Sequence, residues 1–148
     1  MPIHALQPYL ALPFATTSTN TPLLLTVSRH SQQLLMLEQQ IACVRDRQEG
    51  ERLLNEYLDA SLNEADAAGQ RHLLPLQESW LNRCYLTLRQ ATLNPDAPLH
   101  WRSLCFDYLY QPFFALQHLY ISNPQQKRKL RNLLHEFRSL GRLFSVDC

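Results

Sequence analysis

The sequence predicts an all-α protein: an irregular bundle of four to five helices behind a flexible N-terminal arm. The chain has 148 residues but only three glycines, which is few for a sheet with many tight turns. After residue 28, apolar residues recur mostly at spacings of three and four, and no useful stretch alternates as a strand does. A chain of this length favours one domain with a substantial buried core.

Residues 1–27 form the expected flexible arm. They contain four prolines and no charged side chain, and a run of Thr, Ser and Asn extends from 16 to 21. Such a composition favours an extended or disordered chain. Two interpretations stay open: a plain mobile terminus, or a recognition arm in which Tyr9 and Phe14 dock as extended anchors. The composition also resembles the unstructured export signals of bacterial type III secretion substrates, and this resemblance implies a link to secretion.

Residues 28–148 are expected to form a single helical domain. Its first helix, over about 28–48, has a narrow apolar seam formed by Leu34, Leu37, Ile41 and Val44. Gly50 then predicts a break or a kink. A second helix is expected over 51–68, with one leucine-rich face and one acidic face, and Gly69 is expected as its C-cap.

The third helix is expected to start near Leu74, with Pro75 in its first turn. Trp80 stands at the centre of its apolar stripe and is therefore assigned to the core. Residues 94–98 predict a connector, in which Asp96 or Ala97 caps the next helix.

The fourth helix, over 99–121, is the most informative segment. It holds half of the fourteen aromatic residues and only two charged residues, Arg102 and Asp107. A helix that is apolar on most sides is either the centre of a bundle or a surface for a partner. Pro112 is expected to kink or split it. The candidate partner-binding residues are Trp101, Tyr108, Tyr110, Phe113, Phe114 and Tyr120.

The fifth helix has the clearest start and the best amphipathic pattern. Asn123 is expected to cap it, Pro124 to take its first position, and it should run to about Leu143. One face is apolar, and a basic stripe with His135 in it follows the other. The candidate residues for an anionic partner are Lys127, Arg128, Arg131, Arg138 and Arg142.

Charge is unevenly distributed along the chain. Residues 1–122 carry eight basic and eleven acidic side chains, a net of −3, whereas residues 123–148 carry six and two, a net of +4. An anionic partner is therefore expected at the C-terminal end. The basic stripe has three interpretations: a face that is solvated or pairs with the acidic second helix, a site for an anionic protein, or a site for nucleic acid.

The sequence contains no motif that predicts catalysis or a metal site. It lacks the patterns of hydrolases, phosphate-binding loops, dinucleotide folds and zinc proteins, and its four cysteines are isolated. We therefore expect no enzyme activity, no cofactor and no metal. Isolated cysteines favour reduced thiols in the cytoplasm, and no segment reads as a membrane span.

These observations predict a non-catalytic helical adaptor, chaperone or regulator that binds another protein. An accessory of a bacterial secretion system fits the uncharged arm. The alternative is a nucleic-acid-binding accessory factor that uses the basic fifth helix, and a homo-oligomer is a further open option.

Overall fold

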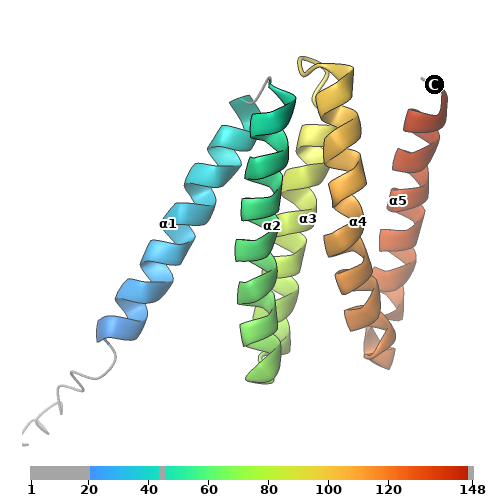
Figure 1. The fold of residues 1–148 in the computed structure, drawn as a ribbon. Coiled ribbons are helices and arrows are strands. Elements are labelled where there is room, and N and C mark those ends of the chain that lie inside the picture. Colours follow the sequence, from blue (N-terminus) through green and yellow to red (C-terminus); the bar gives the residue numbers. More distant parts are fainter. Residues whose placement is uncertain (1–20, 44–45, 147–148) are drawn as a thin grey trace, which may run out of the picture. The chain divides into compact units, whose positions relative to one another are not determined.

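The structure, a computed structural model, describes residues 21–43 and 46–146, with side chains from 29 to 145 within these ranges. It contains five α-helices and, in the described ranges, no strand, so the predicted all-α fold is confirmed (Figure 1). The helices are α1 (Thr21–Cys43), α2 (Arg47–Gln70), α3 (Leu74–Leu93), α4 (Leu99–Ile121) and α5 (Lys127–Val146), and a 3-10 turn, η1 (Pro124–Gln126), precedes α5. The chain divides into two compact units, residues 1–32 and 33–148.

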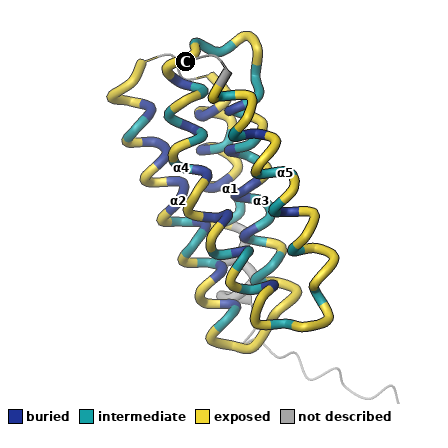
Figure 2. The backbone as a smooth tube through the Cα atoms, turned by 90° about the vertical axis from the view of Figure 1, so that its right-hand side faces the viewer, coloured by how far each residue is buried: buried dark blue, intermediate teal, exposed yellow. Residues whose placement is uncertain are grey.

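Within the second unit, α3 and α4 are the central pair of helices. They make the most extensive contact with each other, α2 packs on both, and α5 packs on α4. The end of α1 contributes three residues of its predicted seam, because Leu34, Leu37 and Ile41 are all buried. The fourth, Val44, lies outside the described residues. Burial recurs about once per turn along α2, α3 and α4, as the dark segments of Figure 2 show, whereas only Leu133 and Leu140 are buried in α5. The result is a single continuous core.

The boundary between α1 and α2 differs from the prediction. Residues 1–20 of the expected arm lie outside the described residues. Residues 21–27 were also expected to belong to the arm, but they are helical, because α1 begins at Thr21. It ends at Cys43, and Gly50, the expected break, lies inside α2. The true start of α2 is set by Asp46, whose side chain accepts a hydrogen bond from the Glu49 N–H at 3.3 Å. This N-cap bond satisfies a donor at the start of the helix, so the helix begins before the glycine.

Gly50 has a packing role instead of a role as a breaker. It is buried, and a Cβ atom added to it would overlap the ring of Trp101 on α4. Trp101 is only 2% exposed, so its indole fills the space that the missing side chain leaves. Gly50 thus permits the close approach of α2 and α4.

The end of α2 also differs from the prediction. Gly69 is still helical, and the residue with left-handed backbone is His72, with φ 57°. The His72 N–H donates to the Gly69 carbonyl at 3.0 Å, and the Leu73 N–H donates to the Ala68 carbonyl at 2.9 Å. These two bonds form a Schellman motif with histidine in the position that glycine usually takes.

The caps of α4 and α5 are simpler than expected. Pro98 is the N-cap of α4, with no side-chain bond, so neither Asp96 nor Ala97 caps it. Asn123 is the N-cap residue of η1 and Pro124 is its first residue, as predicted, but the Asn123 side chain makes no capping bond, because its amide donates to the Leu119 carbonyl at 2.8 Å. These turns are held mainly by backbone hydrogen bonds.

Pro112 does not split α4, which continues as one helix through it. An interior proline costs about 3 kcal/mol because it removes a hydrogen bond and crowds the preceding turn. Here Pro112 is itself fully buried, and α4 packs against α3, α2 and α5, which offsets the loss of that hydrogen bond. Tertiary packing therefore overrides the local preference for a break.

Trp80 is the other correction in this region. It is half-buried at the edge of the core, where the Arg83 guanidinium lies 5.7 Å from the centre of its ring. The buried positions of α3 are Leu81, Cys84, Tyr85, Leu88 and Thr92. The apolar stripe of α3 is thus rotated away from Trp80 and towards Tyr85.

A candidate protein-docking face on α4 and α5

The six aromatic residues predicted to bind a partner fall into two groups. Trp101, Phe113 and Tyr120 are at most 6% exposed, so they belong to the core and are not free to meet a partner. Tyr108 is half-buried. Tyr110 and Phe114 are 40% and 57% exposed. The partner surface predicted from sequence is therefore reduced to these two rings.

Tyr120 is buried because it joins three helices. Its hydroxyl donates to Glu78 of α3 at 3.0 Å, and Glu78 also accepts from Lys129 of α5 at 2.6 Å. Burial raises the pKa of Tyr120 to about 12, so the phenol stays protonated and remains a donor at neutral pH. Its role in this structure is to connect helices.

The exposed rings continue an aromatic seam between α4 and α5. Phe113 stacks on Phe137 with ring centres 3.9 Å apart, and Phe106 stacks on Phe144 at 5.0 Å. Tyr110 meets Phe137 edge-on at 4.9 Å, and Phe114 contacts Tyr110 at 5.9 Å and Phe113 at 5.3 Å. The seam positions both outer rings, so little side-chain freedom is left for them to lose on further burial.

One further exposed apolar residue lies on the same side of α4. Ile121 is 61% exposed, and it follows Tyr110 by eleven residues and Phe114 by seven. At about 100° per residue these three positions share one side of the helix. Ile121 is not among the predicted partner-binding residues, which are all aromatic, although its spacing from Tyr110 and Phe114 is visible in the sequence.

The predicted basic stripe of α5 is exposed in full. Among the described residues, no ion pair engages any of its cations. The exposed members are Lys127, Arg128, Arg131, His135, Arg138 and Arg142.

The orientation of this stripe follows from two ion pairs on the opposite flank of α5. Lys129 pairs with Glu78, and Glu136 pairs with Arg89, so this flank faces α3. Residues two positions further along lie about 200° around a helix. Arg131 and Arg138 therefore lie on the flank away from α3, which borders the exposed side of α4.

We call the combined surface the α4–α5 face. It consists of an apolar column on α4 and a cationic column on α5. The apolar column is Tyr110, Phe114 and Ile121, and the cationic column is Lys127, Arg131, Arg138 and Arg142.

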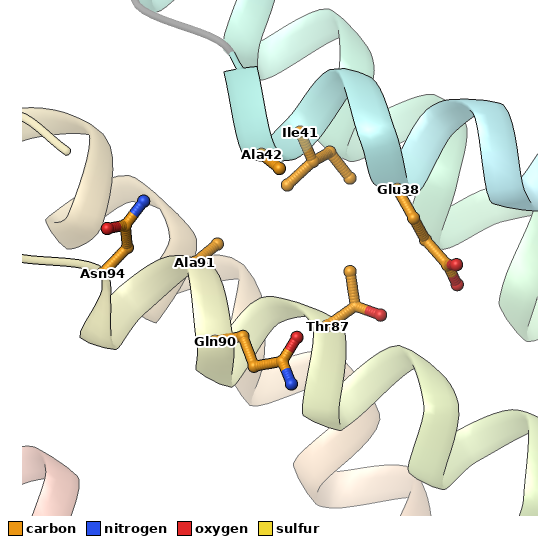
Figure 3. A pocket seen from close by; sticks show the side chains of 7 residues that line it. All are labelled: Glu38, Ile41, Ala42, Thr87, Gln90, Ala91 and Asn94. Atoms are coloured by element: carbon orange, nitrogen blue, oxygen red, sulfur yellow. The ribbon is translucent and has the colours of Figure 1, made fainter. Parts of the chain in front are cut away.

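A hollow elsewhere in the second unit offers no catalytic arrangement. It has a volume of about 450 Å³ and lies between the end of α1 and α3, with Glu38 at one end and Thr87 and Gln90 on its α3 wall (Figure 3). The Glu38 carboxylate accepts two hydrogen bonds from Arg83, at 2.7 and 3.0 Å, and one from the Tyr57 hydroxyl at 3.0 Å. Its oxygens are thus engaged in holding α1 to α2 and α3.

Two of the described cysteines, Cys84 and Cys105, are buried. Burial raises the pKa of both Cys84 and Cys105 to about 12, so neither thiol ionises near neutral pH. Within residues 21–43 and 46–146, no three His, Cys, Asp or Glu side chains are placed to hold a metal ion. None of the described helices combines the length and apolarity needed to cross a membrane.

Comparison with known proteins adds no assignment, since no family model, no curated protein and no solved structure matches this chain.

Proposed function

We propose that this protein is a non-catalytic adaptor, chaperone or regulator that binds another protein through the α4–α5 face. The observation that carries the proposal is the exposed pair Tyr110 and Phe114, which the aromatic seam holds in place. Aromatic side chains supply much of the binding energy in protein interfaces, and rings that are already positioned bind at a smaller entropic cost.

The remainder of the molecule supports a binding role over a catalytic one. The one carboxylate that lines the hollow between α1 and α3 is held by Arg83 and Tyr57. The two buried thiols have raised pKa values. The proposal includes a cytoplasmic location, which rests on the use of isolated, reduced cysteines.

A role beside a bacterial secretion system is a finer form of the same proposal. It rests on the uncharged composition of residues 1–27, which resembles export signals. Of these residues, 1–20 lie outside the part of the chain that the structure describes.

The test is quantitative affinity capture followed by mass spectrometry, with a variant of the face and a matched control. We expect Tyr110→Ser combined with Phe114→Ser to lose the captured partner. The control, Leu76→Ser combined with Leu86→Ser, changes two leucines of α3 with similar exposure, 44% and 45%, and should retain it. If the face variant keeps the partner, the proposal is wrong. Sedimentation of the purified chain shows whether the partner is a second copy.

The alternative function, nucleic-acid binding, is favoured by the exposed cations of α5, which form no ion pair with the residues that the structure describes. It predicts binding that weakens steeply with salt, with a slope that falls by roughly one unit for each phosphate contact removed. Changing the four residues of the cationic column to Gln would then abolish the binding. Micromolar binding of DNA or RNA by the parent chain in physiological salt would replace our proposal with this alternative.

A further inference from the structure

The two columns of the α4–α5 face run side by side, and the cationic column is the longer one. The apolar column extends from residue 110 to residue 121, about 16 Å of helix, and the cationic column from residue 127 to residue 142, about 22 Å. Because Phe113 stacks on Phe137 and Phe106 on Phe144, the antiparallel helices keep one register along the seam. This register places Lys127 beside the Ile121 end of the apolar column and Arg142 beside the Tyr110 end.

The apolar column has the spacing that a partner helix requires. Residues at i, i+4 and i+11 line one side of α4, and a helix that packs on them presents its own apolar residues at intervals of three and four. About three to four turns of such a helix match the length of the column. The mixture of rings with the alkyl group of Ile121 suits leucine-like side chains, whereas stacking of bases uses rings alone.

Charge at the face is one-sided. The four cations all lie on the α5 flank, and none has an ion-pair partner among the described residues. The other flank of α4 has no Lys or Arg and carries the exposed carboxylate Asp107, together with Gln111 and His118. A bound helix is therefore favoured when its acidic residues follow one edge of its apolar stripe, and disfavoured when basic residues stand there.

We propose that the partner segment is an acidic amphipathic helix of about 15 residues, with its apolar stripe on Tyr110, Phe114 and Ile121 and its carboxylates along the cationic column. The inference rests on the proposed function, because it specifies the chemistry of the partner at the same face.

The probes are two synthetic helical peptides of equal length. Both have leucines at intervals of three and four; one has Glu along one edge of the stripe and the other has Lys. We expect the full-length protein to bind the Glu peptide at least tenfold more tightly than the Lys peptide, measured by fluorescence anisotropy. Equal affinity for the two peptides, or absence of binding to the Glu peptide, would overturn the inference.

A charge-reversal variant distinguishes a change in binding from a loss of folding, because an unfolded variant could not bind either peptide more tightly. Arg138→Glu combined with Arg142→Glu should weaken the Glu peptide about tenfold or more and strengthen the Lys peptide. The control Arg71→Glu, which reverses an exposed arginine at the end of α2, should leave both affinities within about twofold. Loss of both peptides without a gain for the Lys peptide would contradict the proposed pairing.

The outcome separates this inference from the proposed function. If the Tyr110 and Phe114 variant loses its captured partner but the peptides show no charge preference, the face binds protein and the helix chemistry is wrong. If the captured partner is retained by that variant, the proposed function fails as well. Tighter binding of single-stranded DNA than of the Glu peptide would reject both.

Discussion

The inner and outer sides of α4 have similar amino acids and opposite roles. The inner side includes Trp101, at 2% exposure, and Leu109 and Leu116, which are fully buried, whereas Phe114 and Ile121 on the outer side are 57% and 61% exposed. Burying a large apolar side chain contributes roughly 1.5–3 kcal/mol to stability. The exposed side chains on the outer side do not contribute most of this stabilisation in the free protein. The apolar character of α4 therefore serves folding on one side and, in our proposal, binding on the other.

The largest expected effect separates these two sides directly. Trp101→Ala should lower the free energy of unfolding by about 3–5 kcal/mol, because it empties the space between α2 and α4. Phe114→Ala, the matched change on the outer side, should cost less than about 1 kcal/mol. Urea unfolding of both variants measures the difference. Equal losses would mean that the outer side also belongs to the core.

A second prediction tests the contact behind Trp101. Gly50→Ala should destabilise the protein by about 1–3 kcal/mol, because the new methyl group overlaps the indole ring. Gly141→Ala in α5 meets open space, so it should stabilise the protein by up to about 1 kcal/mol through helix propensity. Thermal unfolding should show opposite shifts in Tm. A gain in both variants would show that α2 and α4 are further apart than the structure has them.

A third prediction compares two tyrosines of the same helix. Tyr120→Phe should cost about 0.5–1.5 kcal/mol, because it removes the donor to Glu78 and leaves the remaining polar groups partly buried. Tyr110→Phe, on the outer side, removes a hydroxyl from a 40% exposed residue and should leave unfolding nearly unchanged. A large loss for Tyr110→Phe in urea titrations would assign its hydroxyl a structural role.

The smallest effect is expected for the cationic column. Changing Lys127, Arg131, Arg138 and Arg142 together to Gln should alter the free energy of unfolding by less than about 0.5 kcal/mol, because all four are exposed. Lys129→Gln is the control, since it breaks the pair with Glu78 and should cost up to about 1 kcal/mol. If the fourfold variant unfolds in buffer, the column is part of the fold and not a free binding surface.

Local sequence patterns were sufficient where one segment carried its own signal. The connector at residues 94–98, the described part of the apolar seam of α1 and the two-sided pattern of α5 are all present in the structure as expected. In α5 a basic stripe lies opposite an apolar stripe, so only one orientation buries the leucines. The exposure of the predicted cations follows from that pattern alone.

Local sequence patterns gave wrong predictions where the structure depends on a residue far along the chain or on a stronger signal nearby. Gly50 suggested a break, but Asp46 starts the helix earlier and Trp101 occupies the space that the glycine leaves. Gly69 suggested a cap, but the chain turns at His72 through backbone hydrogen bonds. Trp80 suggested the core, but the neighbours of α3 bury Tyr85 and leave Trp80 at the edge.

The sequence by itself determined the all-α class, the helical segments and the exposed basic stripe of α5, because each follows from the spacing of residues within one helix. It could not decide which aromatic residues of α4 face inward, because a helix that is apolar on most sides has no preferred direction of burial. Only the packing of α2, α3 and α5 around α4 decided it. That packing buried Trp101, Phe113 and Tyr120 and left Tyr110 and Phe114 beside the cations of α5.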